Sequence, residues 1–164
     1  NARIGVRVSF VLCTGPASEL NRVDDEGLFY GFPFQHALNI KDPEFGDIDS
    51  GYDYVQPILE LGAHVAPTGI AFYDNDFHFP EEFKNNLFIT LHGSWNRSSK
   101  VGYKVLRAVL NEAGEVTTAE DFITGWLQGE KVVGRPSAPS VMSDGSLLIS
   151  DHMANVIYRM TYTY

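Results

Sequence analysis

The stretch SAPSVMSDGSLLIS, residues 137–150, has the pattern of a β-hairpin. Its two β-prone runs, SAPSVM and SLLIS, are separated by a short polar segment that contains Asp144-Gly145. An Asp-Gly pair between such runs is a strong hairpin signal, because both residues tolerate the positive φ that a tight turn requires. A third run, NVIYRMTY (155–162), follows a polar loop. The three runs together predict an antiparallel sheet.

The same order of runs occurs earlier in the chain. The runs GIAFYD (69–74), NLFITL (86–91) and YKVLRAVL (103–110) repeat it, and Leu87 stands sixty residues before its equivalent, Leu147. Antiparallel units repeated at about 40–60 residues are typical of β-propeller blades. We therefore predict an all-β chain with one blade over each triplet of runs. An unrelated β-sandwich meander is the alternative.

The rest of the chain contains little helical pattern. A single helical turn is expected at PEEFKN (80–85), and residues 35–60 are expected to form a long, acidic excursion between blades. The length of 164 residues, with 44% of them hydrophobic, is ordinary for one globular domain. With no internal boundary visible, residues 1–164 are interpreted as part of a single domain.

Charge and composition exclude some classes of partner. Twenty-one acidic and twelve basic residues give a net charge of −9, which opposes binding to nucleic acid or to anionic membranes. No apolar run approaches the roughly 20 residues of a membrane-spanning helix. The single cysteine, Cys13, excludes an internal disulfide.

The loop LHGSWNR (91–97) carries side chains that a turn does not need. Trp95 offers a stacking surface, Asn96 an amide, and Arg97 a planar fork for carboxylates, which together suit a planar anionic ligand. The alternative is that Trp95 fills a gap between blades and Arg97 forms a surface ion pair. His64 and Arg135 stand at equivalent points before successive repeats, which favours a shared site at one end of the sheets.

The segments that carry these residues resemble the glucose/sorbosone dehydrogenase family, and within it the L-sorbosone and fungal pyranose dehydrogenase branch. The resemblance covers roughly residues 15–164 and includes LFITLHGSWNR, GYKVLRAVL and GRPSAPSVMSDGSLLIS. It implies a six-bladed β-propeller that binds pyrroloquinoline quinone (PQQ) and Ca²⁺ at its axis and oxidises sugars. This chain would then supply about three C-terminal blades.

The resemblance also implies which residues contact the quinone. The cofactor carries carboxylates on a flat ring system, so its pocket needs cations and a stacking surface, and two arginines would make strong charge-assisted bonds there. The implied contacts are His64, Trp95, Asn96, Arg97 and Arg135. His92 is interpreted as a brace for its loop, and no role is carried onto Asp151 or His152.

A Gly-Pro pair implies the position of the calcium ion. In the family, the carbonyls of this pair bind the cofactor's Ca²⁺, and the match falls on Gly15 and Pro16; backbone carbonyls are normal ligands of this cation. By the same resemblance, Glu19 and Tyr30 match a loop that holds a second, structural Ca²⁺ in some relatives. For Glu19 the alternative is an ordinary surface carboxylate.

The family's general-base histidine lies in an early blade that this chain does not match, so no catalytic residue is expected here and the chain alone is predicted to be inactive. The expected partners are a sugar substrate and an external electron acceptor, either a cytochrome or a dye. The expected location is extracellular or periplasmic, with any signal peptide outside this chain. The competing interpretations are a non-catalytic propeller that binds protein and a lectin-type propeller that binds carbohydrate.

Overall fold

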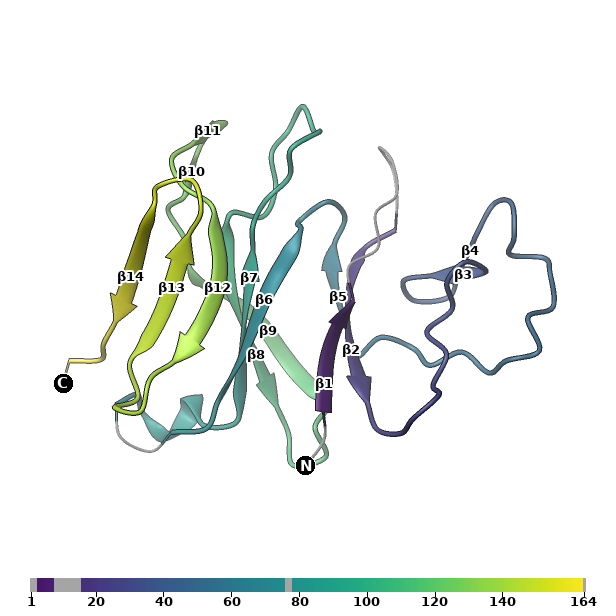
Figure 1. Cartoon of the computed structure of the whole chain (residues 1–164), viewed down its shortest axis with the longest axis horizontal. Coiled ribbons are helices and arrows are strands. Elements are labelled where there is room, and N and C mark those ends of the chain that lie inside the picture. Colours follow the sequence, from purple (N-terminus) through teal and green to yellow (C-terminus); the bar gives the residue numbers. More distant parts are fainter. Residues whose placement is uncertain (1–2, 8–15, 76–77, 164) are drawn as a thin grey trace. The chain divides into compact units, whose positions relative to one another are not determined.

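The computed structural model describes residues 3–7, 16–75 and 78–163 (Figure 1). The chain divides into two compact units, Asn1–His64 and Val65–Tyr164. The single domain over residues 1–164 stays a prediction. In the described part of the chain, no helix is long and apolar enough to span a bilayer.

The second unit contains an antiparallel sheet of four strands in the order β6-β7-β8-β9. The strands are β6 (Pro67–Tyr73), β7 (Asn86–Leu91), β8 (Lys104–Leu110) and β9 (Val116–Ile123). Each residue of β7, NLFITL, is buried, as expected of a strand between two neighbours. The outer strand β9 has the polar sequence VTTAEDFI and is largely exposed. The antiparallel sheet predicted over the first triplet is confirmed, with β9 as a fourth strand.

A second sheet follows in the order β12-β13-β14. Its strands are β12 (Pro136–Val141), β13 (Leu147–Asp151) and β14 (Val156–Met160), all antiparallel. The Asp144-Gly145 pair lies in the turn between β12 and β13, and Gly145 has a φ of +83°. The hairpin prediction is therefore confirmed, with a turn closed by the bond from the Gly145 amide to the Met142 carbonyl at 2.9 Å.

Three short elements complete the second unit. The turn of 3₁₀ helix η1 (Glu81–Phe83) falls inside the predicted helical turn. The strands β10 (Leu127–Gln128) and β11 (Lys131–Val132) form a small hairpin, which follows β9 and precedes β12 in the sequence.

The two sheets of the second unit pack together around an aromatic and aliphatic core. Phe88, Leu147 and Ile149 are fully buried in it. The backbones approach closely at Gly69, where a Cβ atom would lie 2.7 Å from the Pro139 side chain and 2.8 Å from the Ala138 Cα. Only glycine allows β6 and β12 to come this near each other. The sheets thereby bring the loops at their ends into contact.

The first unit contains a sheet in the order β1-β2-β5 and a separate small hairpin. The elements are β1 (Arg3–Arg7), β2 (Ser18–Val23), β3 (Gln35–His36), β4 (Ile40–Lys41) and β5 (Leu59–Gly62). The excursion predicted at residues 35–60 is thus irregular except for the β3-β4 hairpin and the start of β5. A part-buried pair, His36 Nε2 and Asp42 Oδ2 at 2.7 Å, joins β3 to the residue that follows β4.

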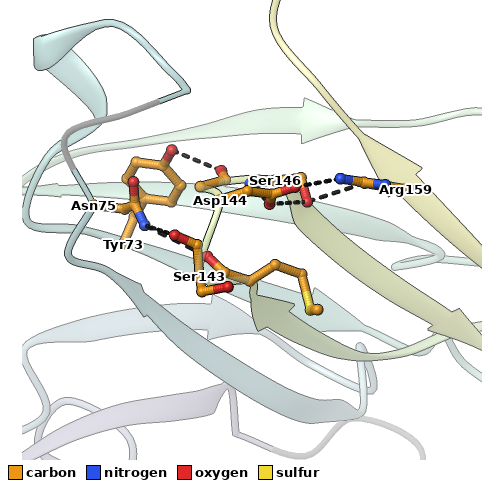
Figure 2. A network of polar contacts seen from close by, with 8 residues as sticks. Tyr73, Asn75, Ser143, Asp144, Ser146 and Arg159 are labelled. Atoms are coloured by element: carbon orange, nitrogen blue, oxygen red, sulfur yellow. Dashed lines mark hydrogen bonds and ion pairs between the residues drawn. The ribbon is translucent and has the colours of Figure 1, made fainter.

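A polar network closes the end of the second unit where β12 turns into β13 (Figure 2). The buried Tyr73 hydroxyl donates to the Gly145 carbonyl at 2.8 Å and accepts from the Phe79 amide at 3.1 Å. In the same turn, Asp144 accepts from the Ser146 hydroxyl at 2.7 Å and pairs with Arg159 of β14. The network fixes the hairpin turn to both sheets.

The Asp144 carboxylate gives this turn a defined acid sensitivity. Its hydrogen bonds with the Ser146 side chain and backbone, followed by the charge of Arg159, lower its pKa from 3.8 to about 2. Because folding favours the ionised form, this contribution to stability is complete above pH 3.8 and is lost as the pH falls through about 2. We expect the urea midpoint of unfolding to fall over this range. In Asp144→Asn this part of the pH dependence should be absent, and an unchanged pH profile in that variant would contradict the assignment.

Candidate functional site

The loops at the opposite end of the second unit carry four of the five predicted quinone contacts, Trp95, Asn96, Arg97 and Arg135. The loop 92–103 joins β7 to β8, residues 134–135 lead into β12, and the turn 152–155 joins β13 to β14. Since these strands are antiparallel, the three segments emerge at the same end, away from the network of Figure 2. Direct contacts between the segments, described below, confirm this.

Tyr103 is the centre of the loop 92–103. Its side chain is buried, with 1% of the residue exposed, and its ring lies against Gly93, where a Cβ atom would be 2.5 Å from three ring carbons. Its hydroxyl donates to the Ser94 carbonyl. The Ser94 amide donates to the Val101 carbonyl at 2.9 Å, and the Ser94 hydroxyl accepts from the Val101 amide at 3.1 Å. The base of the loop is therefore held by its own hydrogen bonds.

Arg135 contacts this loop from the other sheet. Its Nη2 atom donates to the Ser94 carbonyl and to the Tyr103 hydroxyl, each at 3.1 Å, and the guanidinium lies 5.3 Å from the centre of the Tyr103 ring. Both bonds use the same nitrogen. The Nε and Nη1 atoms make no hydrogen bond to the described residues. Since a guanidinium has five N–H donors, most of the fork is left for a ligand.

Trp95, Asn96 and Arg97 stand at the tip of the same loop. Trp95 is 76% exposed, so within the described chain it does not fill a gap between blades. Arg97 is also exposed and forms no ion pair with a described residue, in contrast to the surface pair considered above. The Asn96 Oδ1 atom is buried and has no hydrogen-bond partner among the described residues. An acceptor buried without a partner is costly, so this oxygen has unused hydrogen-bonding capacity.

His92 holds the loop in place, as its position suggested. Its Nδ1 atom lies 3.0 Å from the Pro136 carbonyl, which can only accept, so Nδ1 carries the proton. Burial, followed by the neighbouring charge of Arg135 and by His152, lowers the pKa of His92, although the bond to Pro136 opposes this. The ring is therefore neutral at pH 7 and braces the loop rather than attracting an anion.

The remaining predicted quinone contact, His64, is the last residue of the first unit. It has a positive φ of +62°, which is unusual for a residue other than glycine. Its buried Nε2 atom has no partner among the described residues. A quinone contact by His64 stays a prediction, because its geometry belongs to the first unit and the other contacts belong to the second.

The predicted calcium ligands also lie in the first unit, and Gly15 falls outside the described residues. Pro16 precedes β2, and calcium binding by its carbonyl oxygen stays a prediction. Glu19 is buried, which rules out the surface carboxylate: Oε1 accepts from the Ala37 amide at 2.5 Å and Oε2 from Asn21 at 3.1 Å. The Tyr30 hydroxyl donates to the Arg22 carbonyl at 2.9 Å.

These contacts tie Glu19 to the excursion and Tyr30 to β2. In the described chain, no three His, Cys, Asp or Glu side chains are grouped as metal ligands. A second calcium ion at Glu19 and Tyr30 stays a prediction.

The comparisons with known proteins identify the family. The TrAA12-like family matches residues 13–129, well over half of the chain. The chain belongs to the TrAA12-like family. Over 152 residues it is 40% identical to an uncharacterized protein of Borreliella burgdorferi, a match that covers 90% of this chain and 39% of that protein.

Solved structures establish the fold of this TrAA12-like chain. It is similar to the holo form of the pyranose dehydrogenase PQQ domain from Coprinopsis cinerea, with a TM-score of 0.67, 21% identity, and coverage of 90% of this chain and 44% of that one. It is also similar to the calcium structure of the Trichoderma reesei carbohydrate-active enzyme family AA12, with a TM-score of 0.62, 21% identity, and coverage of 88% and 42%. The all-β chain is part of a β-propeller and spans about two fifths of the length of these relatives.

Two residues of the candidate site were not predicted to belong to it. Tyr103 was interpreted only as the first residue of a strand, and Asp151, which is bonded to the Arg135 backbone, was given no role. Two glycines could have drawn attention to Tyr103. Gly102 precedes it in the sequence and Gly93 packs against its ring, and both have positive φ.

Proposed function

We propose that this chain is part of a PQQ-dependent sugar dehydrogenase that oxidises a hydroxyl or aldehyde group of an aldose, pyranose or sorbosone. Membership of the TrAA12-like family and the fold shared with a pyranose dehydrogenase PQQ domain support the proposal. The observation that carries it is the state of Arg135. One nitrogen of its guanidinium is held by Ser94 and Tyr103, and the others make no hydrogen bond to a described residue, beside the loop with the exposed Trp95.

The side chains of the loop fit such a cofactor. Bound quinone would accept two electrons from the sugar and pass them to an external acceptor, either a cytochrome or a dye. Arg135 and Arg97 would hold its carboxylates by charge-assisted hydrogen bonds, and Trp95 would stack on its ring. The unpartnered Asn96 Oδ1 atom would accept a hydrogen bond from a ring N–H group.

Calcium is proposed at the Gly-Pro pair of the first unit. The Pro16 carbonyl supplies an oxygen of the kind that Ca²⁺ prefers, and Gly15 would supply its neighbour. An extracellular or periplasmic location belongs to the same proposal.

Dye-linked sugar oxidation by the full-length protein tests this function. We expect turnover of at least one aldose, pyranose or sorbosone when both quinone and Ca²⁺ are supplied, and none when quinone is omitted. The matched control is the same protein with a quinone that lacks carboxylates, which the two arginines cannot hold. A protein that takes up no quinone would contradict the proposed function.

The 164-residue chain by itself is expected to show no sugar oxidation. By family resemblance, the general base lies outside it, and a positioned base contributes roughly 10²–10⁴-fold to the rate. The measurement is the same dye-linked assay, with the chain at the concentration that gives full turnover in the full-length protein. Turnover by the isolated chain would show that a base of this chain has been overlooked.

A further inference from the structure

Asp151 is a buried carboxylate at the end of β13, with 3% of the residue exposed. Its Oδ1 atom accepts from the amides of Met153 at 2.9 Å, Ala154 at 2.8 Å and Arg135 at 2.9 Å. Its Oδ2 atom accepts from the Tyr158 hydroxyl at 3.2 Å. No Lys or Arg side chain of the described residues forms an ion pair with it, so a buried charge is met by neutral donors alone.

Burial by itself would raise the pKa of Asp151, but the hydrogen bonds from Ala154, Arg135, Tyr158 and Met153 outweigh it, and the pKa is lowered. The carboxylate is therefore charged at neutral pH. The bonds from the Met153 and Ala154 amides show that Asp151 stabilises the β13-β14 turn. They do not explain the bond to Arg135, which is sixteen residues away.

The bond to Arg135 is one of a pair that hold both polar groups of its backbone. Asp151 accepts from the Arg135 amide, and the His152 amide donates to the Arg135 carbonyl at 3.1 Å. The approach is possible only because Gly134 lacks a side chain: a Cβ atom there would lie 2.2 Å from Asp151 Oδ2 and 2.4 Å from Trp126. The backbone of Arg135 is thus held by the last residue of β13 and the residue after it.

The guanidinium at the other end of the residue is fixed separately by Ser94 and Tyr103. A long, flexible side chain held at both its backbone and one terminal nitrogen has few remaining rotamers, so its Nε and Nη1 groups point in a defined direction.

We propose that Asp151 is a positioning residue for Arg135, which aims the Nε and Nη1 atoms of the guanidinium at a carboxylate of the bound ligand. The proposal rests on the proposed function for the identity of that ligand. The link between Asp151 and Arg135 does not depend on it.

The first test measures that link without a ligand. Asp151→Asn keeps the shape of the side chain but removes the negative charge, so the hydrogen bonds from the three backbone amides become weaker. We expect faster picosecond-to-nanosecond motion of the Arg135 Nε–H group in ¹⁵N relaxation of the apo-protein, with the overall fold retained by circular dichroism. Tyr158→Phe is the control, because it removes only the bond to Oδ2 and should leave the Arg135 signal unchanged. Arg135 motion that is the same in wild type and Asp151→Asn would overturn the proposal.

The second test is a double-mutant cycle read out as the dissociation constant for pyrroloquinoline quinone at fixed Ca²⁺. Asp151→Asn should weaken binding by about 3- to 10-fold, as for the loss of part of one hydrogen bond. In an Arg135→Ala background it should change the affinity less than twofold, since the group it positions is gone. Equal effects in both backgrounds would indicate a turn cap alone and would overturn the proposal. If wild-type protein binds no quinone, the proposed function fails, and the relaxation measurement still decides the role of Asp151.

Discussion

Arg135→Ala is expected to weaken quinone binding by about 10- to 150-fold. A ligand carboxylate would lose its charge-assisted hydrogen bonds, which typically contribute about 1.5–3 kcal/mol. The large effect follows from the pre-set position of the guanidinium: Ser94 and Tyr103 already hold it, so little entropy is lost when the ligand binds. Calorimetric titration of the apo-protein with quinone at fixed Ca²⁺ measures the change in affinity.

Arg159→Ala is the matched control for that titration. It removes the same charge from the same unit, but Arg159 is bonded to Asp144 and Ser146 at the opposite end of the sheets (Figure 2). The affinity for quinone should stay within twofold of wild type. Equal losses in the two variants would mean that net charge, and not the Arg135 site, governs binding.

Gly93→Ala is expected to destabilise the second unit by about 2–5 kcal/mol. Gly93 has a φ of +98°, where a residue with a side chain is strained by about 1–2 kcal/mol. The new methyl group would also lie 2.5 Å from the buried Tyr103 ring, and such overpacking typically costs about 1–3 kcal/mol. The ring cannot easily give way, because its hydroxyl is bonded to Ser94 and Arg135. The free energy of unfolding in urea measures the loss.

Gly129→Ala separates the two causes. Gly129, in the β10-β11 turn, also has a positive φ of +62°, but a Cβ atom there would have nothing within 4 Å. It should lose only the backbone contribution of about 1–2 kcal/mol. If Gly93→Ala cost no more than Gly129→Ala, the packing of Tyr103 against the loop would not be a constraint on the site.

The strands of both sheets could be predicted from the sequence because their signals are local. The runs at 69–74 and 86–91 are β-prone and bounded by turn residues, and Asp144-Gly145 marks a turn within two residues. The position of the fourth strand, β9, was not predicted, because its sequence VTTAEDFI is polar. It is the outer strand of the sheet and pairs only with β8. Its strand state comes from pairing rather than from hydrophobicity.

The site could be predicted in part, for the same reason. The loop with Trp95 and Arg97 contains side chains that neither a turn nor a core requires, and these stand exposed in the structure. Tyr103 and Asp151 could not be found this way, since their roles depend on bonds to residues that are distant in sequence, such as Arg135. The same holds for Glu19, whose partner Ala37 lies eighteen residues away and makes the carboxylate a buried anchor.

A crystal structure of the full-length protein grown with pyrroloquinoline quinone and Ca²⁺ tests the central claim most directly. The account predicts planar density stacked on Trp95, with a carboxylate within hydrogen-bond distance of the Arg135 Nε or Nη1 atom and with the Ser94, Tyr103 and Asp151 contacts unchanged. Quinone density at any other surface of the protein, with the Arg135 guanidinium facing solvent, would contradict it.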